Sequence, residues 1–156
     1  MSLVRLLAAL AVAIPLALRA QEPKALLETM QHNVGRISPS LEYDRWSANI
    51  ALWEVRLEHP GKGTSAVLAQ MRKSLGVMTG VVSQIRGPEE KERWELNRDM
   101  WTSLLDDGGA LPAASRQSLR NMLKRLRANV EKIAAPGERE RWTVNCDLWQ
   151  AELGAK

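Results

Sequence analysis

The chain has few of the residues that form most catalytic and metal sites. Its 156 residues include one cysteine, two histidines and no phenylalanine. A single cysteine excludes an intrachain disulfide and the paired-cysteine motif that attaches haem covalently. The two histidines, His32 and His59, do not have the spacing of a metal-ligand pair. There is no glycine-rich phosphate loop, serine nucleophile elbow or zinc-binding helix motif. We therefore expect no enzyme activity, no cofactor and no bound metal.

The excess of positive charge is small and is partly confined to one end. The 22 Lys and Arg residues outnumber the 18 Asp and Glu residues, which gives a formal net charge of +4. Arg5 and Arg19 lie in the first twenty residues, so the remainder has 22 − 2 = 20 basic residues, 18 acidic ones and a net charge of +2. This balance argues against nucleic-acid binding. One basic stretch is predicted to be a solvated helix face, and it comprises Arg116, Arg120, Lys124, Arg125 and Arg127.

The first twenty residues predict a secretory signal peptide. Arg5 supplies a positive start, residues 6–18 are apolar apart from Pro15, and Ala20 is a small residue at the expected cleavage site. The apolar stretch is shorter than the ~20 residues that span a bilayer. We expect cleavage after Ala20, a periplasmic or secreted protein, and no stable membrane span after cleavage. An uncleaved membrane anchor is the alternative. Residues 21–156 would then form a single domain.

Tryptophan is the abundant aromatic residue, and all six copies belong to one repeated pattern. The pattern is Trp-x-x-Asn-x-x-[Leu/Met]-Trp, with an arginine directly before it, and it recurs every 48 residues (94 − 46 = 48, 142 − 94 = 48). A fixed period of this length indicates structural repeats, here at about 23–59, 64–107 and 112–156. The twelve motif residues are Arg45, Trp46, Asn49, Trp53, Arg93, Trp94, Asn97, Trp101, Arg141, Trp142, Asn145 and Trp149.

Each repeat is predicted to contain two helices joined by a bend. Apolar residues recur at helical spacing before the bend, and Trp and Asn recur at helical spacing after it. Ile37 and Trp46 are nine residues apart, so on one straight helix they would face opposite sides. Proline stands between the halves every time, as Pro39, Pro88 and Pro136. The predicted helices are 23–37, 40–58, 64–86, 88–106, 112–134 and 137–153. We expect an all-α fold of three helix–proline corner–helix repeats after an N-terminal signal helix, either closed into a compact bundle or stacked as a short α-solenoid.

The retained residues have both structural and functional interpretations. We expect the six indoles to form the core between paired helices; the alternative is a groove for a sugar, a quaternary amine or a flat cofactor, which needs half-exposed rings. Each motif asparagine is predicted to donate to carbonyls at the end of the preceding helix, with ligand binding as the alternative. The arginines are predicted to pair with a glutamate three residues earlier and to lie over a Trp ring or bridge to another helix. Cys146 is expected to be a small apolar filler, or else to form an intermolecular disulfide.

Together these patterns predict an exported, non-enzymatic helical repeat protein that acts as a structural part or a protein-interaction module. The alternative is a small-ligand or cofactor binder that uses a groove lined by the motif Trp and Asn residues. A protein partner is compatible with either architecture. The sequence determines neither the identity of that partner nor the oligomeric state.

Overall fold

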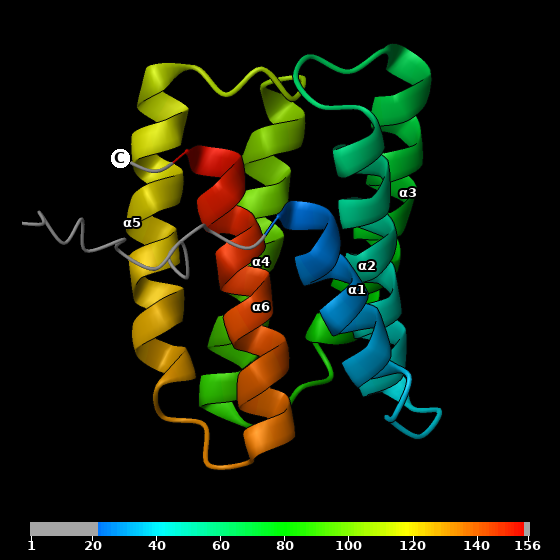
Figure 1. The fold of residues 1–156 in the computed structure, drawn as a ribbon, viewed down its shortest axis with the longest axis vertical. Coiled ribbons are helices and arrows are strands. Elements are labelled where there is room, and N and C mark those ends of the chain that lie inside the picture. The colour runs from blue at the N-terminus through cyan, green and yellow to red at the C-terminus, as the bar shows by residue number, and fades with distance from the viewer. Residues whose placement is uncertain (1–21, 155–156) are drawn as a thin grey trace, which may run out of the picture.

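The structure is a computed structural model that describes residues 22–154, and all regular secondary structure in this range is helical. The predicted signal peptide, residues 1–20, lies outside the described residues. Six helices run up and down alongside one another (Figure 1). They are α1 (Pro23–Val34), α2 (Leu41–Glu58), α3 (Ser65–Val82), α4 (Pro88–Asp106), α5 (Ala113–Val130) and α6 (Pro136–Leu153). For residues 22–154 the prediction of an all-α fold with six helices is confirmed.

The second helix of each hairpin begins at or just after the proline. Pro88 and Pro136 are the first residues of α4 and α6, where the missing N–H group has no helical partner to lose. In the first hairpin Pro39 comes earlier, and Ser40 caps α2 by accepting a hydrogen bond from the Tyr43 amide at 3.2 Å. Acidic residues occupy the first turn of all three helices, where the helix dipole favours negative charge.

The first helix of each hairpin ends three or four residues earlier than predicted. The last helical residues are Val34, Val82 and Val130, whereas the predicted ends were 37, 86 and 134. Beyond these ends the backbone tightens into turns in which an amide donates to the carbonyl three residues before it. The donor–acceptor pairs are Ile37 to Val34 at 2.9 Å, Ile85 to Val82 at 3.1 Å and Ile133 to Val130 at 3.0 Å. These bonds satisfy carbonyls that the helix end would otherwise leave unpaired.

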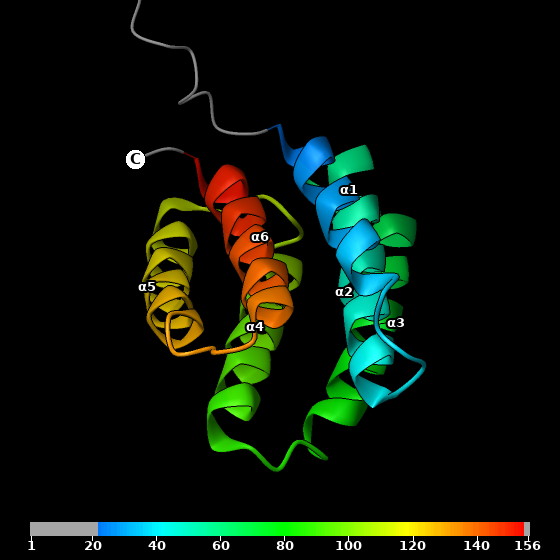
Figure 2. The same ribbon diagram turned by 60° about the horizontal axis from the view of Figure 1, so that its bottom comes forward.

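The six helices form a closed ring. Each helix packs against its neighbours in the chain, and α1 also packs against α6, which closes the ring as a compact bundle and excludes an open stack. We call α2, α4 and α6 the inner helices and the line that they surround the central axis; α1, α3 and α5 are the outer helices. No Cα atom of one inner helix lies within 8 Å of another inner helix, so side chains fill the space around the axis. Figure 2 shows the ring from a second direction.

A buried arginine ties together the two connections between hairpins. Arg56, at the end of α2, donates to the carbonyl oxygens of Gly61 at 2.6 Å and Gly109 at 3.0 Å, and it forms an ion pair with Glu152 of α6. The equivalent of Arg56 in the second hairpin is Leu104, and in the third hairpin it is Glu152 itself. The three inner helices therefore place a base, an apolar residue and an acid at one level of the bundle.

Candidate functional site

The six tryptophans lie around the central axis in two groups of three. Trp46, Trp94 and Trp142 form the first group, in which each pair of ring centroids is 4.8 Å apart and packs edge to face. Trp53, Trp101 and Trp149 form the second, with centroid distances from 4.5 to 4.9 Å. Every indole is at most 1% exposed. Such clusters combine a large buried apolar area with favourable aromatic geometry.

A closed ring of amides lies between the two groups, and we call it the asparagine ring. Asn49 donates to the Oδ1 atom of Asn145 at 3.0 Å, Asn145 donates to Asn97 at 3.0 Å, and Asn97 donates to Asn49 at 2.9 Å. All three side chains are fully buried. Each Oδ1 atom accepts a second bond from an indole Nε1–H at 2.9 to 3.0 Å, and the donors are Trp53, Trp101 and Trp149.

The prediction that these asparagines pin the proline corners is wrong. The carbonyls at the helix ends already accept from the amides of Ile37, Ile85 and Ile133, so no side-chain donor is needed there. The asparagine stripe faces the central axis, where the equivalent asparagines and the indoles of the other hairpins are within reach. A buried amide takes the partners that its helix face presents.

The second amide hydrogen has a partner in only two of the three hairpins. Asn49 donates to the sulfur of Met30 at 3.8 Å, and Asn97 donates to the sulfur of Met78 at 3.7 Å. The equivalent residue in the third hairpin is Leu126, which has no acceptor. Asn145 therefore makes one side-chain hydrogen bond through its amide nitrogen, where Asn49 and Asn97 make two.

The motif arginines connect neighbouring hairpins instead of pairing within one helix. Their partners are Glu90 for Arg45 at 2.9 Å, Glu138 for Arg93 at 2.9 Å and Glu42 for Arg141 at 3.0 Å. The predicted pairs at a spacing of three residues are thus wrong, because the helices bring the glutamate of the next hairpin closer. Each guanidinium also lies over a Trp ring of that hairpin, at 5.5 to 5.9 Å from the centroid, which confirms the predicted Trp contact and bridge between helices.

Two buried asparagines that sequence reasoning missed extend these contacts. Asn129 accepts from Arg93 at 2.8 Å and donates to Glu92 at 2.8 Å. Asn33 accepts from Arg141 at 2.9 Å and donates to Glu140. The equivalent position in the second hairpin is Val81 (81 − 33 = 48, 129 − 81 = 48), so the third network is absent. A comparison of what differs between the copies, as well as what they share, would have found this exception.

The basic stretch on α5 is more than a solvated helix face. Arg116 and Arg120 each donate to the Leu153 carbonyl oxygen at 3.1 Å, at the end of α6. Positive charge is favourable there because the helix dipole leaves the C-terminus partly negative. Arg127 pairs with Asp147 at 2.9 Å. These side chains therefore help to hold α5 against α6.

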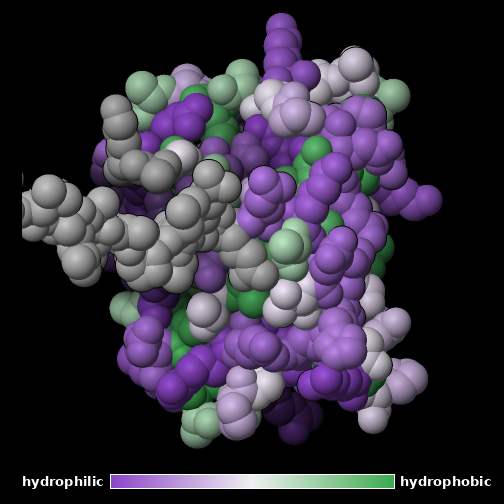
Figure 3. All heavy atoms as spheres, in the orientation of Figure 1, coloured by the Kyte–Doolittle hydropathy of each residue, from purple (hydrophilic) through white to green (hydrophobic). Residues whose placement is uncertain are grey.

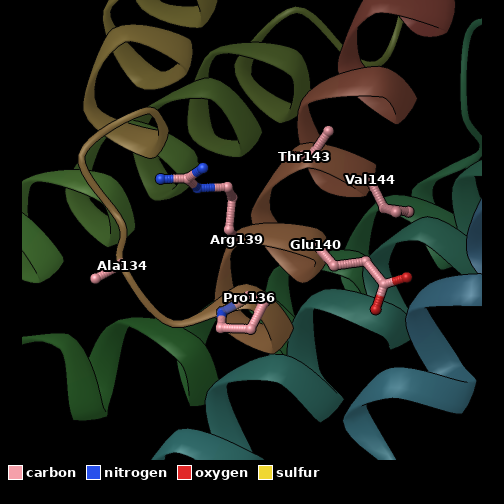
Figure 4. A pocket seen from close by; sticks show the side chains of 6 residues that line it. All are labelled: Ala134, Pro136, Arg139, Glu140, Thr143 and Val144. Carbon is pink, nitrogen blue, oxygen red and sulfur yellow. The ribbon is translucent and has the colours of Figure 1, made fainter.

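The surface concavities are shallow, and each is lined in part by charged side chains. Figure 4 shows one of about 310 Å³ at the start of α6, where the side chains of Arg139 and Glu140 point in different directions. Arg139 donates to the carbonyl oxygens of Glu131 and Ile133, and Glu140 accepts from Asn33. Among residues 22–154 no three His, Cys, Asp or Glu side chains are grouped to hold a metal ion.

Cys146 is enclosed in the core. Its side chain is fully buried, and burial raises the pKa of the thiol to about 12. It therefore remains a neutral thiol at physiological pH, as an apolar filler does.

The geometry places the motif residues in the interior. No indole of the six is exposed enough to line the groove that the ligand-binding alternative requires. None of the helices within residues 22–154 combines the length and the apolarity needed to cross a bilayer. Comparison of the chain with protein-family models, with curated proteins and with solved structures gives no match.

Proposed function

We propose that the protein is an exported, non-enzymatic helical protein that acts through its outer surface, as a structural part or a protein-interaction module. In this proposal residues 1–20 are a signal peptide cleaved after Ala20. Residues 21–156 form one domain of three 48-residue helical hairpins related by an approximate threefold axis.

The observation that carries the proposal is that the motif asparagines bond to one another and to the indoles of Trp53, Trp101 and Trp149. Each Oδ1 atom accepts one bond from another asparagine and one from an indole N–H, so both of its acceptor positions are filled. The arginines face indoles and glutamates of the next hairpin. A catalytic or ligand site needs polar groups that reach the bound molecule and can exchange partners. Because the motif residues maintain the interior, we assign the function to the surface.

The proposal can be tested by photocrosslinking from equivalent exposed positions. Glu28, Gly76 and Lys124 occupy the same place on the three outer helices (76 − 28 = 48, 124 − 76 = 48), and all three are exposed. A photoreactive amino acid at each position, irradiated in the cell of origin, should give a covalent adduct with a discrete protein from at least one helix. The same residue at buried Leu52 is the negative control. The absence of an adduct at every one of the three positions would contradict the proposal.

Tryptophan emission distinguishes this proposal from the alternative of a small-ligand binder. Because the rings are enclosed, we expect blue emission that iodide does not quench and that sugars, quaternary amines and flat cofactors leave unchanged. A ligand that shifts the emission and makes it sensitive to iodide would favour the alternative.

The export part of the proposal has a separate test. The intact mass of the purified exported chain should correspond to a start at Gln21. A mass that retains residues 1–20, found in the membrane fraction, would favour the uncleaved anchor.

A further inference from the structure

An outer helix packs against the inner helix of the neighbouring hairpin at three equivalent contacts, and one of them differs. Between α4 and α5, Glu92 accepts from Asn129 at 2.8 Å and from Arg125 at 3.2 Å, and these two contacts lower its pKa. Between α6 and α1, Glu140 accepts from Asn33. The matching acid between α2 and α3 is Asp44, and the side chains around it are different.

A groove lies at this contact, and we call it the α2–α3 groove. It has a volume of about 270 Å³ and is lined by Asp44, Ser47, Ala48, Ser74, Val77 and Val81. Val81 stands where the other two contacts have Asn33 and Asn129, and Val77 stands where the α4–α5 contact has Arg125. Asp44 is exposed and enters none of the ion pairs formed among residues 22–154. Two valines and an unpaired carboxylate thus occupy the positions at which the other two contacts have a polar network.

Exposed apolar side chains gather beside this groove. Among residues 22–154 the exposed large hydrophobic residues are Leu41 at 45%, Tyr43 at 36% and Val77 at 53%. Leu41 and Tyr43 lie within one helical turn of Asp44, and Val77 lines the groove itself. In contrast, the face shown in Figure 3 is mostly hydrophilic. A cluster of exposed apolar residues with a polar rim is typical of an interaction site.

The face also carries a positive charge on the other side of Val77. Lys73 precedes Val77 by one turn of α3, is exposed, and enters none of the ion pairs within the described part of the chain. Asp44 lies at the start of α2 and lines the groove together with Val77 and Val81 in the C-terminal half of α3. The two helices run antiparallel (Figure 1). Acid and base therefore flank the apolar centre.

We infer that the α2–α3 groove binds a second copy of this chain, in a twofold dimer in which Lys73 of each copy pairs with Asp44 of the other. A twofold axis that passes near Val77 places Lys73 of each copy opposite Asp44 of the other copy. The dimer therefore contains two equivalent ion pairs. The same operation covers both Val77 side chains. The face is thus complementary to itself. This inference rests on the proposed function and names one partner for it.

The outer surface of α3 permits the close approach that such a dimer needs. Gly76 and Gly80 face open space, with no atom within 4 Å of the Cβ that an alanine would add. The equivalents of Gly76 are Glu28 and Lys124, which would hold a neighbouring helix further away.

A charge-exchange experiment tests the pairing directly. Asp44→Lys and Lys73→Asp each place like charges across both halves of the dimer, so each full-length variant alone should dimerise roughly tenfold or more weakly than wild type. In a mixture of the two variants, the lysine introduced in one copy faces the aspartate introduced in the other, and the second half of the dimer keeps the native pair. Sedimentation velocity should therefore show dimers in the mixture but monomers in each separate sample. A mixture that stays monomeric would overturn the inferred pairing.

A second variant asks whether the groove itself is the interface. Val77→Arg with Val81→Asn installs the residues that the α4–α5 contact has, and the arginine should pair with Asp44 within one copy. We expect a monomer that unfolds at or above the wild-type temperature. Wild type that is monomeric over the whole concentration series, or a variant that still dimerises, would overturn the inference. So would wild-type monomers that bind phospholipid vesicles or a different protein through this face. In each of these cases, photocrosslinked adducts from Glu28 on α1 or Lys124 on α5 would still support the proposed function, even though the dimer is excluded.

Discussion

Each asparagine of the asparagine ring has a second neighbour that fixes the orientation of its amide. If the three amides were reversed, every indole N–H would face an NH₂ group in place of an oxygen. The bonds from Trp53, Trp101 and Trp149 therefore select one direction of donation around the ring. Satisfied polar networks of this kind favour a single packing arrangement of a core, while a missing member leaves costly unpaired groups.

Replacement of one asparagine of the ring should lower the unfolding free energy by more than the small size of the side chain suggests. Asn97→Ala removes the acceptor of both Asn145 and Trp149, which leaves two buried donors unpaired. We expect a loss of about 1–3 kcal/mol of unfolding free energy for each donor, measured by urea denaturation. The exposed Asn121→Ala is the control and should change little. A stability of Asn97→Ala equal to wild type would show that the ring is unimportant.

The third hairpin can be given the sulfur acceptor that it lacks. Leu126→Met nearly conserves volume and provides an acceptor for the second amide hydrogen of Asn145. We expect a gain of about 0.5 kcal/mol in unfolding free energy, since hydrogen bonds contribute on this order. The reverse change, Met78→Leu, should lower stability because Asn97 loses its sulfur partner. Changes of the same sign in both variants would contradict the role of the sulfur.

Cys146 should make the unfolding free energy fall in alkaline solution. Burial raises the pKa of the thiol from 9.0 to about 12, so the unfolded chain loses this proton at lower pH than the folded chain. The contribution is fully present below pH 9 and declines as pH rises toward 12, by about 1.4 kcal/mol per pH unit at most. Chemical denaturation of wild type and Cys146→Val across this range measures the difference. Parallel curves for the two proteins would contradict the prediction.

At the level of elements, every outer helix packs against two inner helices that belong to different hairpins. The hairpins therefore share their cores, and the contacts between them are as specific as those within them. Arg56 shows this most clearly, because it joins α2, α6 and both connections between hairpins. Gly109 lies close to this cluster with φ at 83°, and an added Cβ would come within 2.6 Å of the Gly61 carbonyl oxygen.

The ion pair of Arg56 with Glu152 can be tested with a double-mutant cycle. Arg56→Leu leaves a largely buried carboxylate without its partner, and we expect a cost of about 3–5 kcal/mol. Adding Glu152→Leu removes the orphaned charge and places leucine at the level where α4 already has Leu104. The double variant should therefore be more stable than Arg56→Leu alone. If urea denaturation shows the two changes to be additive, the pair is not coupled.

At the level of the whole molecule, closure makes the three hairpins mutually dependent. Each Trp group takes one ring from each inner helix, so no hairpin has a complete core of its own. An open stack would allow an end hairpin to unfold separately, since stability in such arrays is a sum over neighbours. A closed ring removes that possibility.

Unfolding should accordingly occur in a single transition. Far-ultraviolet circular dichroism and tryptophan emission should give the same urea midpoint for wild type. Trp94→Ala, in the middle hairpin, should lower that midpoint for the whole chain, with a loss of about 3–5 kcal/mol of unfolding free energy. Two separated transitions in either protein would indicate independent hairpins.

The sequence predicts which residues form the interior, but it does not predict which of their side chains contact one another. The Trp and Asn stripe and the prolines predict six helices and buried rings, because a stripe at helical spacing must face a core. They cannot say that Asn49 binds Asn145, since that depends on three helices meeting at one level. Whether α1 returns to α6 depends on the rotation between successive hairpins, which no single repeat encodes. Asn33 and Arg56 were missed because their equivalents differ from copy to copy.

Because α1 packs against α6, the chain can be given new termini at another connection between helices. Both ribbon views show the start of α1 and the end of α6 at the same end of the molecule. A peptide linker joining them, with new termini cut at the exposed connection around Gly61, would change the order of the hairpins and keep every contact at the axis. Circular permutants of this protein should therefore fold to the same bundle, whichever hairpin is translated first.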